Sequence, residues 1–389
     1  MTAKPFDDLL VLDLSRYLLG GFMSEYFADF GARVIKVEDT KVGDYCRNEE
    51  PLKNGESHYH YALDRNKESL SINLKDEEAL NFFYELVKRA DIIIENYRPG
   101  VSKRLKIDYE TLYDINQGII YCSFSAYGQN DPRSLKPLHD INIVAETGYY
   151  DLNGGNVPVI PPCDLAASMV GLQAVLTALY QRTNTNKGAH IDASMVNSFM
   201  WWNSIVDCRW DFFGSKLDTN SIEYPSVGYN IYRTKDDRML AFGFYEHKFW
   251  NEFCDDINHP ELRDTLKDTK DQNTEAYNAI TRIVKSKTYE EWSEWLSTRD
   301  HCITPILTKT EALESYMTTS PSNMKRVTYP RLGQVLQTNL PHVLNTYSPS
   351  LDDAKEPPML GENSKEIMKE LGASDQIVEE MLGRGAIKD

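Results

Sequence analysis

The first 130 residues alternate short apolar runs with stretches of helical periodicity. Runs rich in Leu, Ile and Val predict strands at 9–14, 33–38, 91–96 and 118–127. Apolar residues at helical spacing predict helices at 20–32 and 76–90. Apolar strands separated by helices are typical of parallel sheets that are covered by helices on both faces. The sequence therefore predicts an α/β fold with a mostly parallel sheet.

The second half of the chain changes character near residue 225. Before that point, 165–182 is the most apolar helix candidate, and 189–202 predicts a strand that leads into a buried helix. After it, a hairpin is expected over 229–244, with its turn at Lys235–Arg238. The other elements expected are a strand at 300–308, a long connector rich in Pro, Asn and Ser at 319–360, and two short helices at 361–385.

Composition and charge limit the classes of protein to which this chain belongs. It has 389 residues, of which 41% are hydrophobic and 26% charged, as in globular proteins of two or three domains. Its net charge of −17 disfavours nucleic acid and anionic membranes, so an anionic ligand must be met by a local basic cluster. No uninterrupted run of 18 apolar residues occurs and the N-terminal residues lack a basic region. We therefore expect a cytoplasmic protein that spans no membrane.

The common sequence signatures of phosphate loops, metal sites and serine hydrolases are absent. Neither G-x-G-x-x-G after a strand nor G-x-x-x-x-G-K-[ST] occurs, and there is no G-x-S-x-G. The six cysteines and eight histidines are scattered, so the sequence predicts buried thiols and no metal site.

Three residues are candidates for chemistry, and each has a structural alternative. Histidine side chains in general can give and take protons near neutral pH, so His139 is either a general acid and base or part of a helix start with Asp140. Asp164 precedes an apolar helix, where an aspartate is more often an N-cap. Glu246 lies in an aromatic segment, but a lone carboxylate is more often solvated. The residues by themselves leave these alternatives open.

Blocks of sequence along nearly the whole chain resemble the family III CoA-transferase superfamily. In order they are VLDLSRYLLGGFMSEYFADFGARVIKVE, DRNKESLSINLK, ENYRPGVSKRLKIDYETL, IIYCSFSAYGQ, RTNTNKGAHIDASM and GENSKEIMKELG. The resemblance implies a large Rossmann-like domain over 1–200, completed by 330–389, and a small α+β domain over 225–325. It also implies linkers at 201–224 and 326–360, and an interlocked homodimer.

Within the superfamily, the motifs favour the α-methylacyl-CoA racemase branch. LHDINI is similar to G-H-D-I-N-Y, FYEHKFW to A-L-E-P-x-F-[WY], and DHCITPIL to D-A-C-V-T-P-V-L. The resemblance implies that His139 and Asp164 exchange protons with opposite faces of a substrate α-carbon. It also implies that Asp140 orients the imidazole or closes the local turn, and that Glu246 belongs to the site.

Two other functions are compatible with the same resemblance. A CoA-transferase would use Asp164 as a nucleophile and move CoA between carboxylic acids. A catalytically silent protein would bind acyl-CoA without turnover, which the retained His, Asp and Glu residues disfavour. The chain departs from its relatives after the aspartate, where Leu165–Ser168 replaces several glycines. Such side chains are expected to narrow the acyl channel.

The resemblance also implies which residues bind CoA, which enters as part of the substrate and not as a tightly bound cofactor. They are Lys36, Arg65, Lys67, Tyr97, Arg98 and Arg104. Lys and Arg side chains pair well with the pyrophosphate and the 3′-phosphate. The partners expected are therefore an acyl-CoA and a second copy of this chain.

Overall fold

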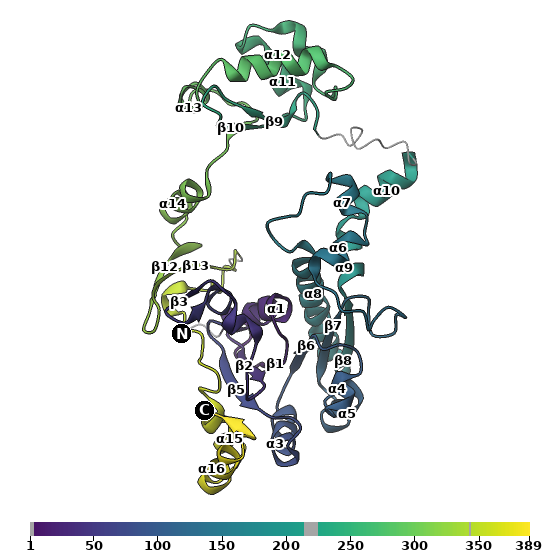
Figure 1. The fold of residues 1–389 in the computed structure, drawn as a ribbon, viewed down its shortest axis with the longest axis vertical. Coiled ribbons are helices and arrows are strands. Elements are labelled where there is room, and N and C mark those ends of the chain that lie inside the picture. Colours follow the sequence, from purple (N-terminus) through teal and green to yellow (C-terminus); the bar gives the residue numbers. More distant parts are fainter. Residues whose placement is uncertain (1–3, 214–224, 342–343) are drawn as a thin grey trace. The chain divides into compact units, whose positions relative to one another are not determined.

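A seven-stranded sheet lies at the centre of the larger part of the chain. The computed structural model describes residues 4–213, 225–341 and 344–389. The strands of this sheet are β1 (Leu10–Asp13), β2 (Arg33–Glu38), β5 (Glu68–Ile72), β6 (Ile92–Glu95), β7 (Ile120–Ser125), β8 (Ala189–Ser194) and β14 (Ile387–Lys388). Their spatial order is β14-β5-β2-β1-β6-β7-β8, and only β14 runs antiparallel to its neighbour (Figure 1). The expected α/β fold with a mostly parallel sheet is confirmed.

The order of the parallel strands reverses between β1 and β6. Counted along the chain, the parallel strands stand in the order third, second, first, fourth, fifth, sixth. Sheets with this order bind ligands in the crevice at the carboxyl ends of the strands where the order reverses. Here the loops that follow β1 and β6, which include Ser15–Tyr17 and Asn96–Arg98, border that place.

Helices cover both faces of the sheet because side chains alternate along each strand. In β1, Val11 and Leu12 belong to different buried clusters on opposite faces. One face packs against α1 (Leu18–Asp29), α6 (Asp140–Ala145), α8 (Pro162–Thr185) and α9 (Met195–Trp202). The other face packs against α3 (Glu77–Val87), α5 (Tyr109–Ile115), α15 (Ser364–Glu370) and α16 (Asp375–Gly383).

Helix α8 is, within the described ranges, the one helix long and apolar enough to cross a membrane by length and composition. From the sequence, 165–182 was the most apolar helix candidate, but the expectation about membrane spans counted only uninterrupted apolar runs and did not include it. Buried core helices share this property, and α8 packs Ala166, Ala167 and Val175 into the core beside the sheet.

The chain divides into two compact units. The large unit consists of the described residues up to Asp151, of Gly155–Asn203 and of Met317–Asp389. The small unit contains Leu152–Gly154 and the described part of Ser204–Tyr316. The sequence placed domain boundaries at 200, 225, 325 and 330, and residues 214–224 and 342–343 of its two linkers lie outside the described residues.

The small unit contains an antiparallel sheet of three strands with helices packed against it. The strands, in the order β11-β10-β9, are β9 (Tyr229–Arg233), β10 (Met239–Gly243) and β11 (Ile303–Pro305). Helices α11 (His247–Asp256), α12 (Thr274–Lys285) and α13 (Tyr289–Leu296) share its core, and the unit also includes α10 (Ser204–Phe213) and most of α14 (Lys309–Thr319). Trp250 and Trp292 are buried in its core. The hairpin expected over 229–244 is therefore present.

The predicted connector at 319–360 is wrong in part, because it contains a hairpin. Strands β12 (Met324–Tyr329) and β13 (Gly333–Thr338) pair antiparallel over their whole length. Their hydrophobic residues pack against Tyr61 of α2 (His58–Leu63), far away in the sequence. Elements also absent from the sequence prediction include β5 of the central sheet, α5, α4 (Val101–Arg104), α7 (Tyr149–Leu152), β3 (Leu52–Lys53) and β4 (Glu56–Ser57).

Candidate active site

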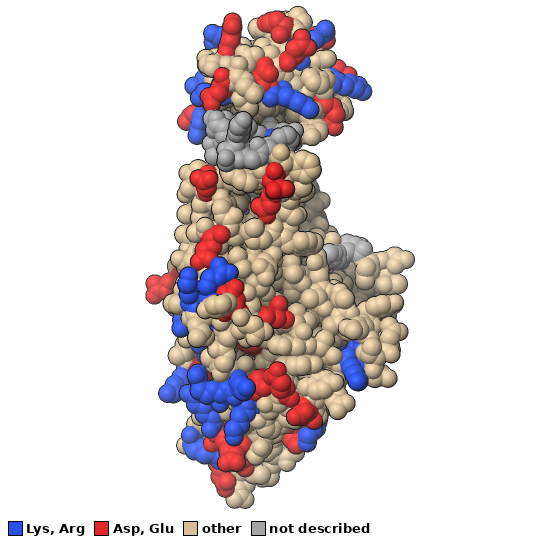
Figure 2. Space-filling model, turned by 90° about the vertical axis from the view of Figure 1, so that its right-hand side faces the viewer, with Lys and Arg blue, Asp and Glu red and all other residues tan. Residues whose placement is uncertain are grey.

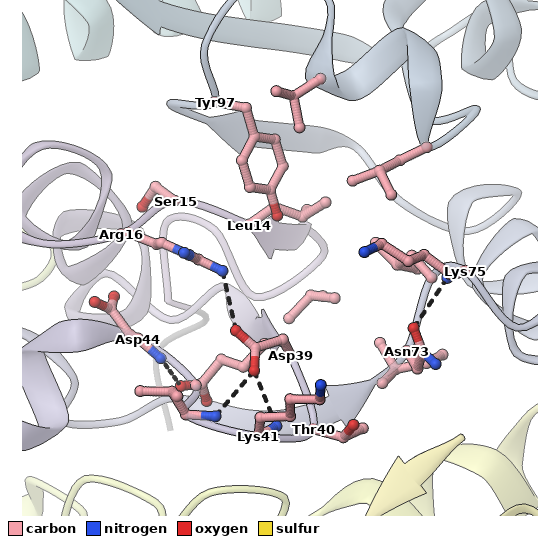
Figure 3. A pocket seen from close by; sticks show the side chains of 18 of the residues that line it. Leu14, Ser15, Arg16, Asp39, Thr40, Lys41, Asp44, Asn73, Lys75 and Tyr97 are labelled. Atoms are coloured by element: carbon pink, nitrogen blue, oxygen red, sulfur yellow. Dashed lines mark hydrogen bonds and ion pairs between the residues drawn. The ribbon is translucent and has the colours of Figure 1, made fainter. Parts of the chain in front are cut away.

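Two cavities open at the carboxyl ends of the parallel strands. The first cavity has a volume of about 620 Å³ and is lined by residues that follow β1, β2, β5 and β6. The polar side chains in its lining include Arg16, Asp39, Lys41, Asn73, Lys75 and Arg104. Arg16 and Lys75 point into it from opposite sides, and Arg16 donates to Asp39 at 3.0 Å (Figure 3).

Basic side chains gather near this first cavity although the whole chain is acidic. Figure 2 shows Lys and Arg residues clustered on one face of the large unit, at the level of α4 and α5 in Figure 1. Helix α4 ends in Lys103 and Arg104, and Arg104 lines the cavity. This is the kind of local basic cluster that an anionic ligand of so acidic a protein requires.

The second cavity, of about 470 Å³, brings together three of the predicted catalytic residues. His139, Asp140 and Asp164 all line it, with Ser125, Ser134, Lys136 and Met195 among the other lining residues. Arg16 and Tyr97 line both cavities, so the two cavities meet at these side chains. A long ligand can therefore extend from one cavity to the other.

Asp140 caps the helix that carries Asp164. Its Oδ1 accepts the backbone N–H groups of Cys163 at 2.7 Å and Asp164 at 3.0 Å. These donors lie in the first turn of α8, where helix N–H groups have no partner within the helix. Asp164 is therefore not the N-cap residue that its local sequence suggested. Asp140 thus links α6 to α8 through hydrogen bonds. From the sequence, this structural role could not be distinguished from a role in orienting the His139 imidazole.

The carboxyl group of Asp164 titrates near neutrality. Burial, and to a smaller extent the neighbouring Asp140 carboxylate, raise its pKa from 3.8 to about 7. A helix N-terminus ordinarily favours the ionised form of a carboxyl group. Here Asp140 already accepts the first N–H groups of α8, so burial has a larger effect on the pKa of Asp164 than the helix N-terminus has. Asp164 can both give and take a proton at neutral pH.

His139 stands at the edge of the same cavity with an exposed side chain. It is the N-cap residue of α6, and its backbone N–H donates to Asn142 Oδ1 at 3.2 Å. His139 thus both begins a helix and faces the cavity.

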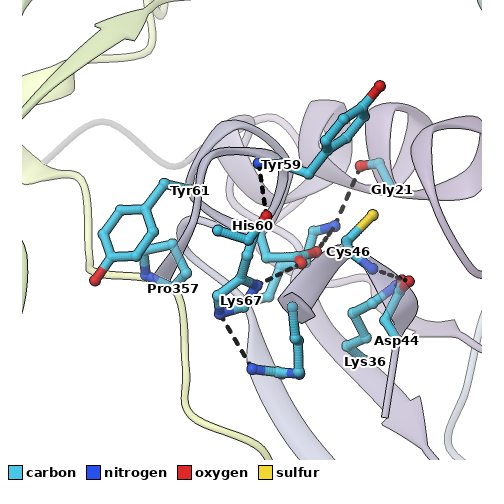
Figure 4. Close-up of polar contacts among 12 residues, drawn as sticks. Gly21, Lys36, Asp44, Cys46, Tyr59, His60, Tyr61, Lys67 and Pro357 are labelled. Atoms are coloured by element: carbon cyan, nitrogen blue, oxygen red, sulfur yellow. Dashed lines mark hydrogen bonds and ion pairs between the residues drawn. The ribbon is translucent and has the colours of Figure 1, made fainter. Parts of the chain in front are cut away.

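Three of the predicted CoA-binding cations lie inside the protein and bind its own carboxylates. Lys36 lies 2.8 Å from Asp44, and Lys67 lies 2.9 Å from Asp64 (Figure 4). Arg65 is paired with Glu25 and Asp29 in the same way. Burial opposes the charge on Lys36, but Asp13 and Asp44 hold its pKa well above its usual value.

These three buried cations differ from the expectation that they face phosphate groups. Lys36 is 1% exposed, and none of the three belongs to the lining of either cavity. Their charges are already neutralised, so they hold the fold together. The other three predicted residues do reach the cavities: Tyr97 lines both, Arg98 the second and Arg104 the first.

The sequence did not single out the cations that line the first cavity. Arg16 follows β1, Lys41 follows β2 and Lys75 follows β5. A sequence signal existed for Arg16 and Lys41, because each lies just beyond the carboxyl end of a predicted apolar strand, whereas β5 before Lys75 was not predicted. Using that signal required the strand order, which only the folded sheet supplies.

Glu246 lies in the small unit, as the exposed residue before α11. The linings of both cavities come entirely from the large unit. A role for Glu246 in catalysis stays a prediction. Within the described ranges, no group of three or more His, Cys, Asp or Glu side chains is arranged to hold a metal ion.

Comparison with known proteins by sequence identifies the family, and comparison with solved structures shows a shared fold. The family model for CoA-transferase family III matches residues 6–364. The chain is 30% identical to the acetyl-CoA:oxalate CoA-transferase of Acetobacter aceti, with 95% of this chain and 97% of that protein covered. It is 27% identical to the α-methylacyl-CoA racemase of Mus musculus, with 94% and 93% covered.

Among solved structures, a CAIB/BAIF family protein from Brucella suis has a TM-score of 0.81 at 23% sequence identity. The match covers 95% of this chain and 100% of that one, so the fold is shared from end to end. Since the family model spans nearly the whole sequence, the chain belongs to CoA-transferase family III, as its motifs led us to expect.

Proposed function

We propose that this protein is an α-methylacyl-CoA racemase-like enzyme that inverts the α-carbon of a 2-methylacyl-CoA thioester. The observation that carries the proposal is that His139 and Asp164 line one cavity while the pKa of Asp164 lies at about 7. Reversible proton transfer needs two groups that each exist in both protonation states at working pH. An imidazole does so without help, and burial brings the carboxyl of Asp164 to the same range.

The reaction proceeds by removal of the α-proton and its return to the opposite face. One of the two groups takes the proton, the C–H electron pair moves into the thioester to form an enolate, and the other group delivers a proton. The enolate oxygen requires hydrogen-bond donors or cations. The hydroxyls of Ser125 and Ser134 and the ammonium group of Lys136 are among the donors that the cavity lining offers.

The first cavity suits the nucleotide part of CoA. It lies where doubly wound sheets bind nucleotides, and Lys41, Lys75 and Arg104 supply positive charge for phosphates. Asp39 follows β2, the place from which a carboxylate accepts ribose hydroxyls in such sheets. The pantetheine arm would then pass Arg16 and Tyr97 to reach the second cavity.

A CoA-transferase is the second candidate. The observation in its favour is that curated relatives of nearly full length include CoA-transferases at 30% and 29% identity, such as succinyl-CoA:glutarate CoA-transferase of Mus musculus. In that reaction the Asp164 carboxylate attacks the thioester carbonyl, and CoA leaves as the thiolate. At neutral pH about half of the Asp164 carboxyl groups are ionised, which is sufficient for a nucleophile.

The interlocked homodimer expected from the family stays part of this proposal. Large apolar side chains are exposed in the large unit, among them Val159 at 104% and Trp201 at 60%. Single exposed apolar residues are ordinary, but a concentration of them marks an interaction surface. A second copy of this chain would cover them.

One experiment separates the candidate functions. The protein is incubated with a 2-methylacyl-CoA in D₂O, and then with a free carboxylic acid and with hydroxylamine. Deuterium at the α-carbon without CoA exchange supports the racemase. CoA exchange that hydroxylamine interrupts supports the transferase. Neither signal, with CoA still bound, means a protein that binds acyl-CoA without catalysis.

The His139→Ala variant tests the assignment of the imidazole. Loss of one acid and base is expected to slow deuterium incorporation by at least about a hundredfold. His259→Ala serves as the control, since His259 lies outside the lining of both cavities. Undiminished incorporation in His139→Ala would contradict the proposal.

A further inference from the structure

Tyr17 has a backbone conformation that side-chain-bearing residues rarely adopt. Its φ is 61° and its ψ is −154°, a combination populated almost only by glycine. By contrast, Asn186 has φ 54° and ψ 20°, the mild left-handed conformation that asparagine tolerates. A strained residue persists only where its surroundings hold it. The groups around Tyr17 must therefore hold its backbone in this conformation.

Side chains hold the backbone of the turn that contains Tyr17. The N–H of Tyr17 donates to Asp44 Oδ1 at 3.0 Å, and Lys36 Nζ donates to the carbonyl oxygen of Ser15 at 3.1 Å. Asn96 holds Arg16 from both sides, since its Oδ1 accepts the Arg16 N–H at 2.9 Å and its Nδ2 donates to the Arg16 carbonyl at 2.8 Å. The three residues of the turn therefore have no freedom to relax.

The holding groups are themselves anchored in the core. Lys36 and Asp44 are 1% and 2% exposed and lie 2.8 Å apart (Figure 4). Lys36 also lies 3.4 Å from Asp13. Buried charges of this kind keep their geometry because leaving a partner unpaired is costly. Lys36 therefore has a function other than binding phosphate: with Asp44 it fixes the turn after β1.

The ring of Tyr17 forms part of the wall of the cavity that holds His139 and Asp164. Its ring centre lies 5.6 Å from that of Tyr45, which also lines this cavity. Glycine would adopt the same backbone conformation without strain. The strain at residue 17 is therefore explained by a need for the side chain at this position. The turn thus holds an aromatic ring at a fixed place beside the catalytic pair.

We infer that Tyr17 is a specificity-determining residue whose clamped ring limits the size of the acyl group that reaches Asp164. The inference rests on the proposed function, since it takes the substrate to be an acyl-CoA. The ring projects from a backbone that cannot shift, and Tyr45 lies beside it, so its side of the cavity excludes bulk more sharply than a ring on a mobile loop would. The enzyme should therefore favour short branched acyl groups over long ones.

The test compares Tyr17→Ala, Tyr17→Gly and the wild-type protein with a short and a long 2-methylacyl-CoA. Both variants remove the ring, so the ratio of kcat/KM for the long over the short substrate should rise at least about tenfold. Tyr17→Phe keeps the wall and should keep the wild-type ratio. The same ratio in Tyr17→Ala as in the wild type, with CoA still bound, would overturn the inference.

A stability measurement tests the strain without any substrate. Glycine normally makes a protein less stable than alanine does, but at residue 17 the order should reverse, with Tyr17→Gly unfolding at a higher urea concentration than Tyr17→Ala. Gln181→Gly and Gln181→Ala, on an exposed part of α8, provide the matched pair with the ordinary order. The ordinary order at residue 17 would contradict the clamp.

Failure of the inference and failure of the proposed function give different results. If the wild-type protein does not bind CoA in a calorimetric titration, the proposed function is wrong. The urea measurement on Tyr17→Gly and Tyr17→Ala uses no substrate, so it tests the strain at residue 17 in either case. If CoA binds and the substrate ratio does not respond to Tyr17, only the inference is wrong. Tyr17→Gly relieves strain, so it remains usable if Tyr17→Ala fails to fold.

Discussion

The raised pKa of Asp164 predicts that its carboxyl group destabilises the protein at alkaline pH. In the unfolded chain this group has a pKa near 3.8, and in the folded protein burial raises it to about 7. The proton is therefore bound more tightly in the folded state. Its stabilising contribution is complete below pH 3.8 and is lost as the pH rises through 7. Asparagine does not titrate, so the Asp164→Asn variant should not lose this stability at alkaline pH.

The magnitude follows from the interval between the two pKa values. Each pH unit is worth about 1.4 kcal/mol, so the interval from 3.8 to about 7 is worth about 4 kcal/mol at most. Asp164 lines a cavity that water enters, which screens the charge, so we expect ~2 kcal/mol. Asp164→Asn should thus be more stable than the wild type by ~2 kcal/mol at pH 8.5, with little difference at pH 4.5.

The assay is urea unfolding at both pH values, followed by far-ultraviolet circular dichroism. Tryptophan fluorescence is less suitable because the buried Trp250 and Trp292 belong to the small unit. The protein concentration must be held constant, since any dimerisation contributes to the apparent stability. Glu366→Gln, at an exposed carboxylate of α15, is the control. An Asp164→Asn variant whose stability relative to the wild type is the same at pH 4.5 and 8.5 would refute the reasoning.

Two further predictions concern the turns that border the cavities. Glu95 Oε2 accepts the N–H of Tyr97 at 2.6 Å, so Glu95→Ala leaves that donor unpaired, at a cost of ~1–3 kcal/mol. The Glu95→Ala variant should have a KM for acyl-CoA about tenfold higher or more in steady-state kinetics. Glu95→Gln keeps an acceptor for the N–H of Tyr97, so its KM should not rise. Gly20→Ala places a Cβ 2.0 Å from Ser15 Oγ, so it should lower the free energy of unfolding by ~1–3 kcal/mol. Gly383→Ala meets nothing within 4 Å and should be neutral in the same urea titration, and equal midpoints for the two variants would contradict the packing argument.

Much of the fold could be predicted from the sequence because its strands are apolar and its helices amphipathic. The run RVIKVE was expected as a strand at 33–38 and is β2 (Arg33–Glu38). The hairpin β12-β13 was missed because its tract was judged by its Pro, Asn and Ser content. The alternation of its hydrophobic residues is explained by their packing against Tyr61, which lies about 270 residues earlier in the chain.

The candidate site was predictable to a similar extent. Motif resemblance pointed to His139 and Asp164, and both line one cavity. It also pointed to Lys36, but the sequence shows only that a cation is present. Asp44 lies eight residues further on, and nothing in the local sequence says that its carboxylate turns back to pair with Lys36 inside the protein.

The sequence by itself determined the family, the alternation of strands and helices, and the residues able to carry acid and base chemistry. Local periodicity and motif order are properties of neighbouring residues, so they can be read along the chain. The tertiary structure decided which groups are charged, buried or strained. The pKa of Asp164, the neutralised charge of Lys36 and the conformation of Tyr17 each depend on residues from several elements. Burial and electrostatic interaction depend on distances in space, and those exist only after folding.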